Sequence, residues 1–204
     1  MQHETSPRDG TRDRARDTKS EIHQAALELF SSRGYEKTSL REIAEQVGIT
    51  KASLYYHYSS KQDLLKAIIG TFLADIQQVL TLVDQVEWSP ESERELLGAY
   101  LDVVIKHRAT GPTVLRDVAA VLAAFGEDLE TLIDRSRNFQ LWLAGPNPTA
   151  KDRVLAAASV EVIGAALAAG TDQTELSDAE LRTVLLDAAT AVLARRSTPT
   201  ESKL

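Results

Sequence analysis

The pattern of apolar and polar positions along the chain is that of a helical protein. From Thr18 onward apolar residues recur at spacings of three and four, which predicts a first helix over about residues 18–33. Thr18 and Glu21 are spaced as a capping box at its start, and Gly34 is a typical C-terminal cap. Residues 1–17 interleave arginines with carboxylates and offer almost nothing to bury, so we expect a disordered N-terminal arm there.

Three further helices follow, two short and one long, and each has its own start signal. Ser39 is followed three residues later by Glu42, which predicts the start of a second helix, and Gly48 predicts its end. Thr50 can cap a third short helix, and Ser60 can cap a fourth that continues into a long apolar run. Residues 18–66 therefore form three short helices that lead into a long one.

Turn-forming residues divide the remainder of the chain into five further helices. No stretch alternates between apolar and polar residues for long enough to indicate a strand, and no repeat of fixed period is present. The expected fold class is all-α, with about nine helices in total. The turns are marked by Ser89-Pro90 with Glu93, Gly111-Pro112, Gly126, Gly145-Pro146-Asn147-Pro148, Gly170, and Ser177 with Glu180.

Composition places this helical chain among soluble proteins. Its 204 residues contain no cysteine, which excludes disulfides, thiol nucleophiles and thiolate metal sites and fits a reducing compartment. The N-terminus lacks the apolar stretch of a secretory signal, and no apolar run approaches the roughly 20 residues that span a bilayer. We therefore expect a cytoplasmic protein without membrane association.

Residues 39–58 meet the steric demands of a helix-turn-helix. Such a motif needs a small residue inside the first helix, a glycine at the turn, and an apolar residue in the second helix that packs back on the first. Ala44, Gly48 and Leu54 supply these at the right offsets. Gly48 can adopt the positive φ of a tight turn at low cost.

The same segment resembles the DNA-binding domain of the TetR/AcrR family of transcriptional regulators. The resemblance covers about residues 18–66 and departs from the family at Tyr58, where Phe is more common. It implies an N-terminal three-helix DNA-binding domain followed by a larger helical domain that dimerises and binds a small effector. It rests on Leu29-Phe30, Gly34-Tyr35, Thr38-Ser39-Leu40-Arg41-Glu42-Ile43-Ala44, Val47-Gly48-Ile49, Lys51-Ala52-Ser53-Leu54-Tyr55-Tyr56-His57-Tyr58 and Ser60-Lys61.

The resemblance implies that the third helix enters the major groove of DNA, where side chains near its N-terminus reach base edges. Lys51 could donate to guanine, and hydroxyls or helix starts could hold phosphates. A structural interpretation stays open for several positions, since Ser39, Thr50 and Ser60 cap helices in any case. Tyr58 could be a core residue, and His57 could be a structural histidine with its hydrogen bonds satisfied inside the protein. The expected DNA-binding residues are Ser39, Arg41, Thr50, Lys51, Ser53, Tyr55, Tyr56, His57 and Lys61.

The charge distribution differs between the expected DNA-binding domain and the rest of the chain. The whole chain has a formal net charge of −7, which alone argues against nucleic-acid binding by bulk positive charge. Residues 1–66 hold 11 basic and 10 acidic side chains, a net charge of +1, whereas residues 67–204 hold 12 and 20, a net charge of −8. We therefore expect selective rather than tight non-specific binding to DNA.

The larger domain is expected to span residues 67–196, before a flexible tail at 197–204. Its last two long helices are rich in small and aliphatic residues, and the resemblance implies that they form a homodimer interface; burial in a monomer core is the alternative. Candidate effector-pocket residues, each of which could instead be ordinary core or surface, are Trp88, Tyr100, His107, Arg116, Phe125, Phe139 and Trp142, with Asp117 beside Arg116.

These observations predict a homodimeric repressor that binds a palindromic operator in double-stranded DNA and is released by a small molecule. The alternative is a helical architectural or partner-binding protein without an effector response. The histidines are scattered and no catalytic, phosphate-loop or metal-ligand motif is present, so we expect neither an enzyme nor a cofactor.

Overall fold

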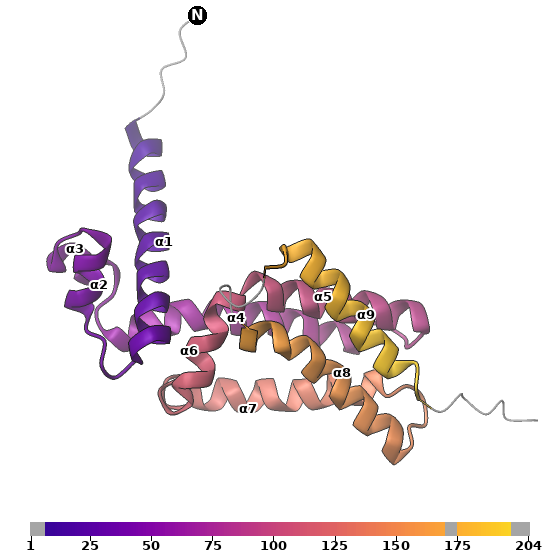
Figure 1. The fold of residues 1–204 in the computed structure, drawn as a ribbon. Helices are drawn as coiled ribbons and strands as arrows, with labels where there is room; N and C mark the ends of the chain where they lie inside the picture. The colour runs from indigo at the N-terminus through magenta and orange to yellow at the C-terminus, as the bar shows by residue number, and fades with distance from the viewer. Residues whose placement is uncertain (1–6, 170–174, 197–204) are drawn as a thin grey trace, which may run out of the picture.

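The computed structural model describes residues 7–169 and 175–196, and within them the protein is entirely helical (Figure 1). The expected all-α fold with about nine helices is confirmed. The expected turn at Gly170 and the C-terminal tail at 197–204 lie outside the described residues. The helices are α1 (Pro7–Arg33), α2 (Leu40–Val47), α3 (Lys51–His57), α4 (Lys61–Thr81), α5 (Pro90–Lys106), α6 (Gly111–Arg116), α7 (Val118–Leu143), α8 (Ala150–Ala169) and α9 (Asp178–Leu193), with 3₁₀ turns η1 (Leu82–Asp84) and η2 (Arg108–Thr110).

Helix α1 begins at Pro7, earlier than the sequence pattern predicted. Thr18 therefore lies inside the helix and is not its N-cap, and the segment 7–17 is helical rather than disordered. Proline is favoured at the first position of a helix, and extension of a formed helix costs far less than nucleation. Figure 1 shows the first turns of α1 extending beyond α2 and α3.

The predicted starts of the next three helices are confirmed. The Ser39 hydroxyl accepts from the Glu42 amide while the Glu42 carboxylate accepts from the Ser39 amide, which completes the capping box. Thr50 and Ser60 cap α3 and α4 in the same way, each accepting from the amide three residues later. Local side-chain chemistry is therefore enough to place these helix ends.

One predicted turn is absent, because Gly126 lies in the interior of α7. A glycine disfavours a helix by only about 1 kcal/mol relative to alanine, and the packing of α7 outweighs that cost. The chain is interrupted instead at Asp117, between α6 and α7.

Helices α4 and α7 each contribute to two hydrophobic cores. The N-terminal core is formed by α1–α3 and the first half of α4, and it includes Val121 and Phe125 from α7. The second half of α4 and the C-terminal part of α7 enter the core of the C-terminal domain. The expected domain boundary after Lys66 therefore falls inside a continuous helix, and we use "C-terminal domain" for η1 to α9 with the second half of α4.

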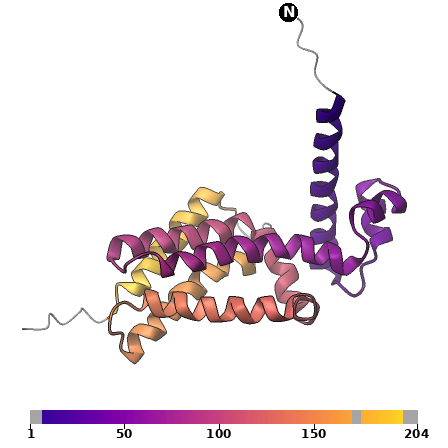
Figure 2. The same cartoon turned by 180° about the vertical axis from the view of Figure 1, so that it is seen from behind.

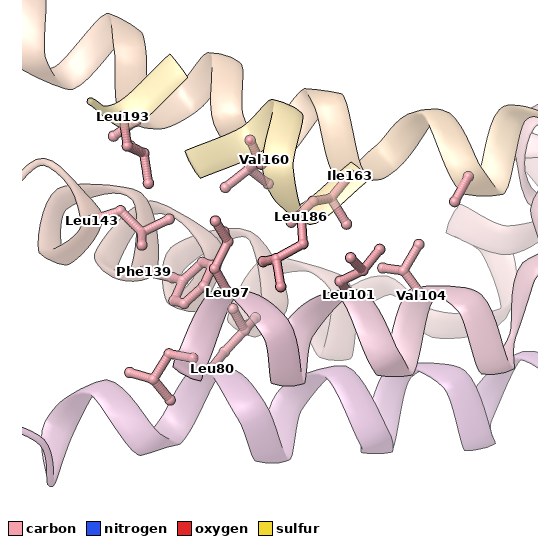
Figure 3. Packing of buried hydrophobic residues seen from close by; sticks show 14 of the residues in the cluster. Leu80, Leu97, Leu101, Val104, Phe139, Leu143, Val160, Ile163, Leu186 and Leu193 are labelled. Carbon is pink, nitrogen blue, oxygen red and sulfur yellow. The ribbon is translucent and has the colours of Figure 1, made fainter. Parts of the chain in front are cut away.

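The core of the C-terminal domain is built from aliphatic side chains with a few aromatic rings (Figure 3). Full burial of each such side chain stabilises the fold by roughly 1.5–3 kcal/mol. This core joins α5 to α7, α8 and α9 into one body. The side chains labelled in Figure 3 are Leu80, Leu97, Leu101, Val104, Phe139, Leu143, Val160, Ile163, Leu186 and Leu193.

Among the described residues, one helical segment, Lys61–Asp84, is long and apolar enough to cross a membrane by length and composition alone, with a mean hydropathy of 1.3. Seven of its apolar residues are buried, and six of these belong to the two cores. Leu64, Leu65, Ile68 and Ile69 lie in the N-terminal core, and Ile76 lies in the core of the C-terminal domain. The segment is therefore a core helix of this fold.

Candidate nucleic-acid interface

Helices α2 and α3 pack as the helix-turn-helix that the sequence predicted. Ala44 is buried at the contact, and Leu54, the one buried residue of α3, is fully buried against α2. Gly48 adopts φ of 78°, a left-handed conformation that glycine reaches without strain. The amide of Ile49 donates to the Ala44 carbonyl at 3.0 Å, which closes the end of α2. The turn between the helices is thus fixed by backbone hydrogen bonds.

Leu54 is the buried residue of α3, and Lys51, Ala52, Tyr55 and Tyr56 face outward. Tyr56 is 87% exposed and Tyr55 is 45% exposed. Large aromatic side chains left this open on a folded domain indicate a surface that binds a partner. In Figure 1, α3 lies at the end of the molecule away from the C-terminal domain, so nothing in the described chain covers it.

Several polar groups on α3 are also available. Thr50 accepts from the Ser53 amide at 3.1 Å, which leaves its hydroxyl proton free within the described chain. Lys51 lies 5.4 Å from the centre of the Tyr55 ring, and Tyr56 meets His57 edge-on at 5.4 Å between ring centres. Within the described residues, Lys51, Tyr55 and Tyr56 have no carboxylate partner. Helix α3 thus offers a lysine, free hydroxyls and exposed rings together.

Three other residues that were expected to bind DNA form hydrogen bonds or ion pairs within the protein. The Ser39 hydroxyl donates to Glu42 at 2.7 Å, as the capping interpretation requires. Arg41 forms an exposed ion pair with Glu45 at 2.7 Å. The Lys61 ammonium donates to the Tyr35 carbonyl at 2.7 Å and lies 4.2 Å from the centre of that ring. The structure therefore brings Thr50, Lys51, Ser53, Tyr55, Tyr56 and His57 onto one open surface, with Ser39, Arg41 and Lys61 at its border.

The electrostatic character of this surface comes from the absence of carboxylate side chains in the segment that forms it. Residues 46–62 contain two lysines and no carboxylate, although the chain has 30 acidic residues. The flanking carboxylates have partners, since Glu45 pairs with Arg41 and Glu42 accepts hydrogen bonds from Ser39. Those hydrogen bonds from Ser39 hold the pKa of the Glu42 carboxyl below its usual value. This stretch without carboxylates is visible in the sequence alone and marks the same surface.

A buried polar contact between Tyr58 and His23 connects the helix-turn-helix to α1. Tyr58 is 7% exposed, so its interpretation as a core residue is confirmed. Its hydroxyl lies 2.5 Å from Nε2 of His23 on α1. Burial, with a smaller contribution from Lys19, lowers the pKa of His23 and favours the neutral imidazole. The sequence did not indicate this contact, which joins residues 35 positions apart.

Arg116 and Asp117 join the two domains. The Asp117 carboxylate accepts from the Tyr35 amide at 2.8 Å. The Arg116 guanidinium donates to the carbonyls of Ser31 and Ser32 at 2.9 and 3.2 Å, at the C-terminal end of α1 where a cation is favourable. The structure thus places this pair against α1, apart from the aromatic residues with which they were expected to line a pocket.

The other pocket candidates fall into four separate places. Tyr100, Phe139 and Trp142 belong to the C-terminal domain, where Tyr100 stacks on Phe139 at 5.3 Å between ring centres. Phe125 lies in the N-terminal core. His107 hydrogen-bonds Asp75 at 2.7 Å, and Trp88 lies 5.5 Å from the Arg196 guanidinium. The seven expected residues therefore do not converge on a single site, and within the described chain no three carboxylate or histidine side chains gather as metal ligands would.

The domain that carries this surface has known relatives. The profile of a family described as "Bacterial regulatory proteins, tetR family" matches residues 22–68. The negative transcriptional regulator IcaR of the biofilm operon icaADBC in Staphylococcus epidermidis is 46% identical over 48 residues, which are 24% of this chain and 26% of that protein. The matched segments span less than a third of the length of four such relatives, so that likeness concerns the N-terminal domain.

Solved structures extend the likeness to the rest of the fold. The ketosteroid transcriptional regulator KstR2 of Mycobacterium tuberculosis has a TM-score of 0.72 at 18% identity, over 88% of this chain and 95% of that chain. AibR, solved with isovaleryl coenzyme A and operator DNA, has a TM-score of 0.53 at 23% identity, over 84% and 97% of the two chains. The DNA-binding motif and the family profile thus agree that residues 22–68 form a DNA-binding domain of the tetR family type, and the chain as a whole shares the fold of KstR2 and AibR.

Proposed function

We propose that this protein is a sequence-specific, DNA-binding transcriptional regulator that represses its target genes in the cytoplasm. The observation that carries the proposal is the open face of α3, where Lys51, Tyr55 and Tyr56 project from a helix anchored by Leu54. A helix presented in this way fits the major groove, which admits an α-helix and displays a distinct pattern of donors and acceptors for each base pair. The similarity to IcaR, a negative regulator, supports repression.

A homodimer is part of the proposal, because a helix-turn-helix protein that reads a palindrome needs two α3 helices about 34 Å apart. The outer faces of α8 and α9 expose Val154 at 68% and Val184 at 54%, together with small residues. Such a surface suits the close packing of two helices against a second copy. Light scattering tests this, since Val184→Asp should convert the dimer to a monomer while Thr183→Asp on the neighbouring position serves as the control.

Release by a small molecule completes the proposal. AibR was solved with both a coenzyme A ester and operator DNA, which supports an effector response in this fold. A ligand can shift the spacing of the two α3 helices only by binding one arrangement more tightly than the other. We propose no catalytic role for the chain, in keeping with the regulatory relatives that it matches.

The decisive experiment is the selection of genomic DNA fragments by the purified full-length protein, followed by binding titrations. We expect fragments that share a palindrome. Tyr56→Ala should weaken binding to that sequence about tenfold, as the loss of a contact worth about 1.4 kcal/mol implies. Leu141→Ala, which truncates an exposed apolar residue on α7, is the matched control and should leave affinity unchanged.

Two outcomes would contradict the proposal. Recovery of fragments without a shared sequence, bound with a steep salt dependence, would favour an architectural protein that recognises only the phosphate backbone. No binding at all would favour a partner-binding helical protein.

A further inference from the structure

The outer face of α7 is uncovered, although it carries large apolar side chains. Figures 1 and 2 both place α7 along the lower edge of the C-terminal domain, and neither view shows another helix of the described chain beneath its middle. Ile133 is 48% exposed and Leu141 is 50% exposed. We name as the α7 face the exposed residues that recur on this side of the helix at spacings of three and four, which are Ala119, Ala123, Gly126, Glu130, Ile133, Arg137 and Leu141.

Gly126 is small for a reason that lies outside the chain. A glycine in the interior of a helix disfavours that helix by about 1 kcal/mol relative to alanine. Gly126 is exposed, and a Cβ atom built on it would meet no neighbouring side chain or other helix within 4 Å, so no described neighbour requires its size. Ala119 and Ala123 precede it on the α7 face. Three small residues in a row allow a second helix to approach the backbone of α7 closely.

The α7 face is complementary to itself when two copies lie antiparallel. Gly126 and Leu141 are equally far along the chain from the midpoint between positions 133 and 134, and the same midpoint lies halfway between 130 and 137. A two-fold axis through that midpoint places Leu141 of each copy over Gly126 of the other, where a side chain is missing. The same register sets Glu130 of each copy opposite Arg137 of the other. The two Ile133 side chains lie beside the axis.

The charges on this face favour a second copy over other partners. Glu130 is exposed and forms no hydrogen bond or ion pair in the described residues, so its carboxylate is available. Arg137 meets Asp134 of its own chain at 3.1 Å, but both side chains are more than 70% exposed, and such a pair contributes little. A partner of one charge sign would leave either Glu130 or Arg137 unmatched. An antiparallel copy matches both in one register.

We propose that the α7 face is a second two-fold interface between copies of this chain, separate from the surface of α8 and α9. A contact made by one helix from each copy is small, and interfaces at the low end of the size range are weak and transient. We therefore expect a Kd above about 10 μM for this association. Dilute samples then contain only the dimer that α8 and α9 form, and concentrated samples contain tetramers.

The position of α3 determines what such a tetramer does. In Figures 1 and 2, α7 forms the lower edge of the molecule and α3 lies on the upper side at one end. A two-fold axis below α7 turns the α3 helices of two copies in opposite directions. The tetramer therefore holds two separate DNA segments together. This consequence rests on the proposed function as a DNA-binding regulator, whereas the self-association stands by itself.

Sedimentation equilibrium of the full-length protein, from low to high micromolar concentration, tests the interface. We expect the mass to rise from that of a dimer to that of a tetramer. Glu130→Arg places two arginines against each other and should weaken association at least about fivefold, because each interface contains the pair twice. Arg137→Glu should have the same effect. Both substitutions together exchange the charges and should restore association.

Glu95→Arg is the matched control, because it makes the same change of charge at an exposed glutamate on α5, away from the α7 face. It should associate as the native protein does. Gly126→Leu fills the space for Leu141 and favours the helix, so it should abolish the tetramer while circular dichroism shows an intact fold. A mass that never exceeds that of a dimer, or a charge exchange that does not restore association, would overturn the interface.

Val184→Asp separates the two interfaces. If it disrupts the contact of α8 and α9, the α7 face should still convert monomers to dimers at high concentration, and adding Glu130→Arg should leave monomers. Monomers of Val184→Asp at every concentration would overturn the α7 interface and leave the dimer of the proposed function standing.

The consequence for DNA is tested with the selected fragment in two forms, one biotinylated for capture and one fluorescent. We expect concentrated native protein to retain the fluorescent form on the captured one, and Glu130→Arg to bind each form without joining them. Equal retention by the two proteins would overturn the joining of DNA segments. Tetramers that bind no specific DNA would overturn the proposed function and leave the α7 interface standing.

Discussion

The hydrogen bond between Asp117 and Tyr35 allows a sharp test of how the two domains are held together. Asp117→Ala removes the carboxylate that accepts from the Tyr35 amide at 2.8 Å. Tyr35 is 9% exposed, so water replaces this acceptor poorly and the amide is left without a partner. Loss of a hydrogen bond to a charged acceptor costs about 2 kcal/mol.

For a chain of this length, 2 kcal/mol corresponds to a fall in Tm of roughly 4–8 °C. Thermal unfolding followed by circular dichroism measures this value. Amide hydrogen exchange provides a local measurement, because the Tyr35 amide should exchange faster in the variant while amides in the core of the C-terminal domain keep their rates. Asp117→Asn, which retains an oxygen acceptor, should lose less stability.

Glu130→Gln is the control for removal of a carboxylate from this part of the chain, since Glu130 is exposed and forms no hydrogen bond or ion pair in the described residues. If Asp117→Ala melts at the same temperature as Glu130→Gln, and the exchange rate of the Tyr35 amide is unchanged, then the hydrogen bond contributes nothing to the joint and the reasoning is refuted.

Three further predictions concern the two cores. Leu54→Ala should lower the free energy of unfolding by about 3 kcal/mol and detach α3, since Leu54 is fully buried and a cavity would remain; urea denaturation showing a loss below about 1 kcal/mol would contradict its anchoring role. Burial and Lys19 lower the pKa of His23, so its stabilising contribution is complete above the unfolded-state value near 6.5 and is lost as pH falls below it. Melting temperatures between pH 8 and 5 should therefore fall more steeply for the native protein than for His23→Gln, and parallel curves would exclude the effect. Arg196 lies 2.5 Å from the buried Glu93, so Arg196→Met should cost about 3 kcal/mol, and adding Glu93→Gln should restore part of that loss. If Glu93→Gln changes the stability in urea equally in the native protein and in Arg196→Met, the pair is not coupled.

The sequence predicted best what is determined by neighbouring residues. The start of α2 is set by Ser39 and Glu42, which are three positions apart, and its end by the left-handed conformation of Gly48. The exposed face of α3 follows from the position of Leu54 within the same short segment. These features require no knowledge of the rest of the chain.

Predictions failed where distant packing decides the outcome. Gly126 was expected to end a helix, but α7 continues through it because residues on both sides enter hydrophobic cores. The contact of Asp117 with Tyr35 spans 82 positions in the sequence, and no local pattern signals it. For the same reason, the candidate pocket residues could be chosen by type but not by where they would meet.

The continuity of α4 and α7 through both cores has a practical consequence for chimaeric regulators. A DNA-binding domain cut out after Lys66 would lose Ile68, Ile69, Val121 and Phe125, four of the apolar side chains that fill its core. Exchanging the N-terminal domain with that of another protein of this fold should therefore succeed only when residues 67–69 of α4 and the first two turns of α7 are exchanged with it. The surface of α3 and the compatibility of its domain with the C-terminal domain are in this way inherited together.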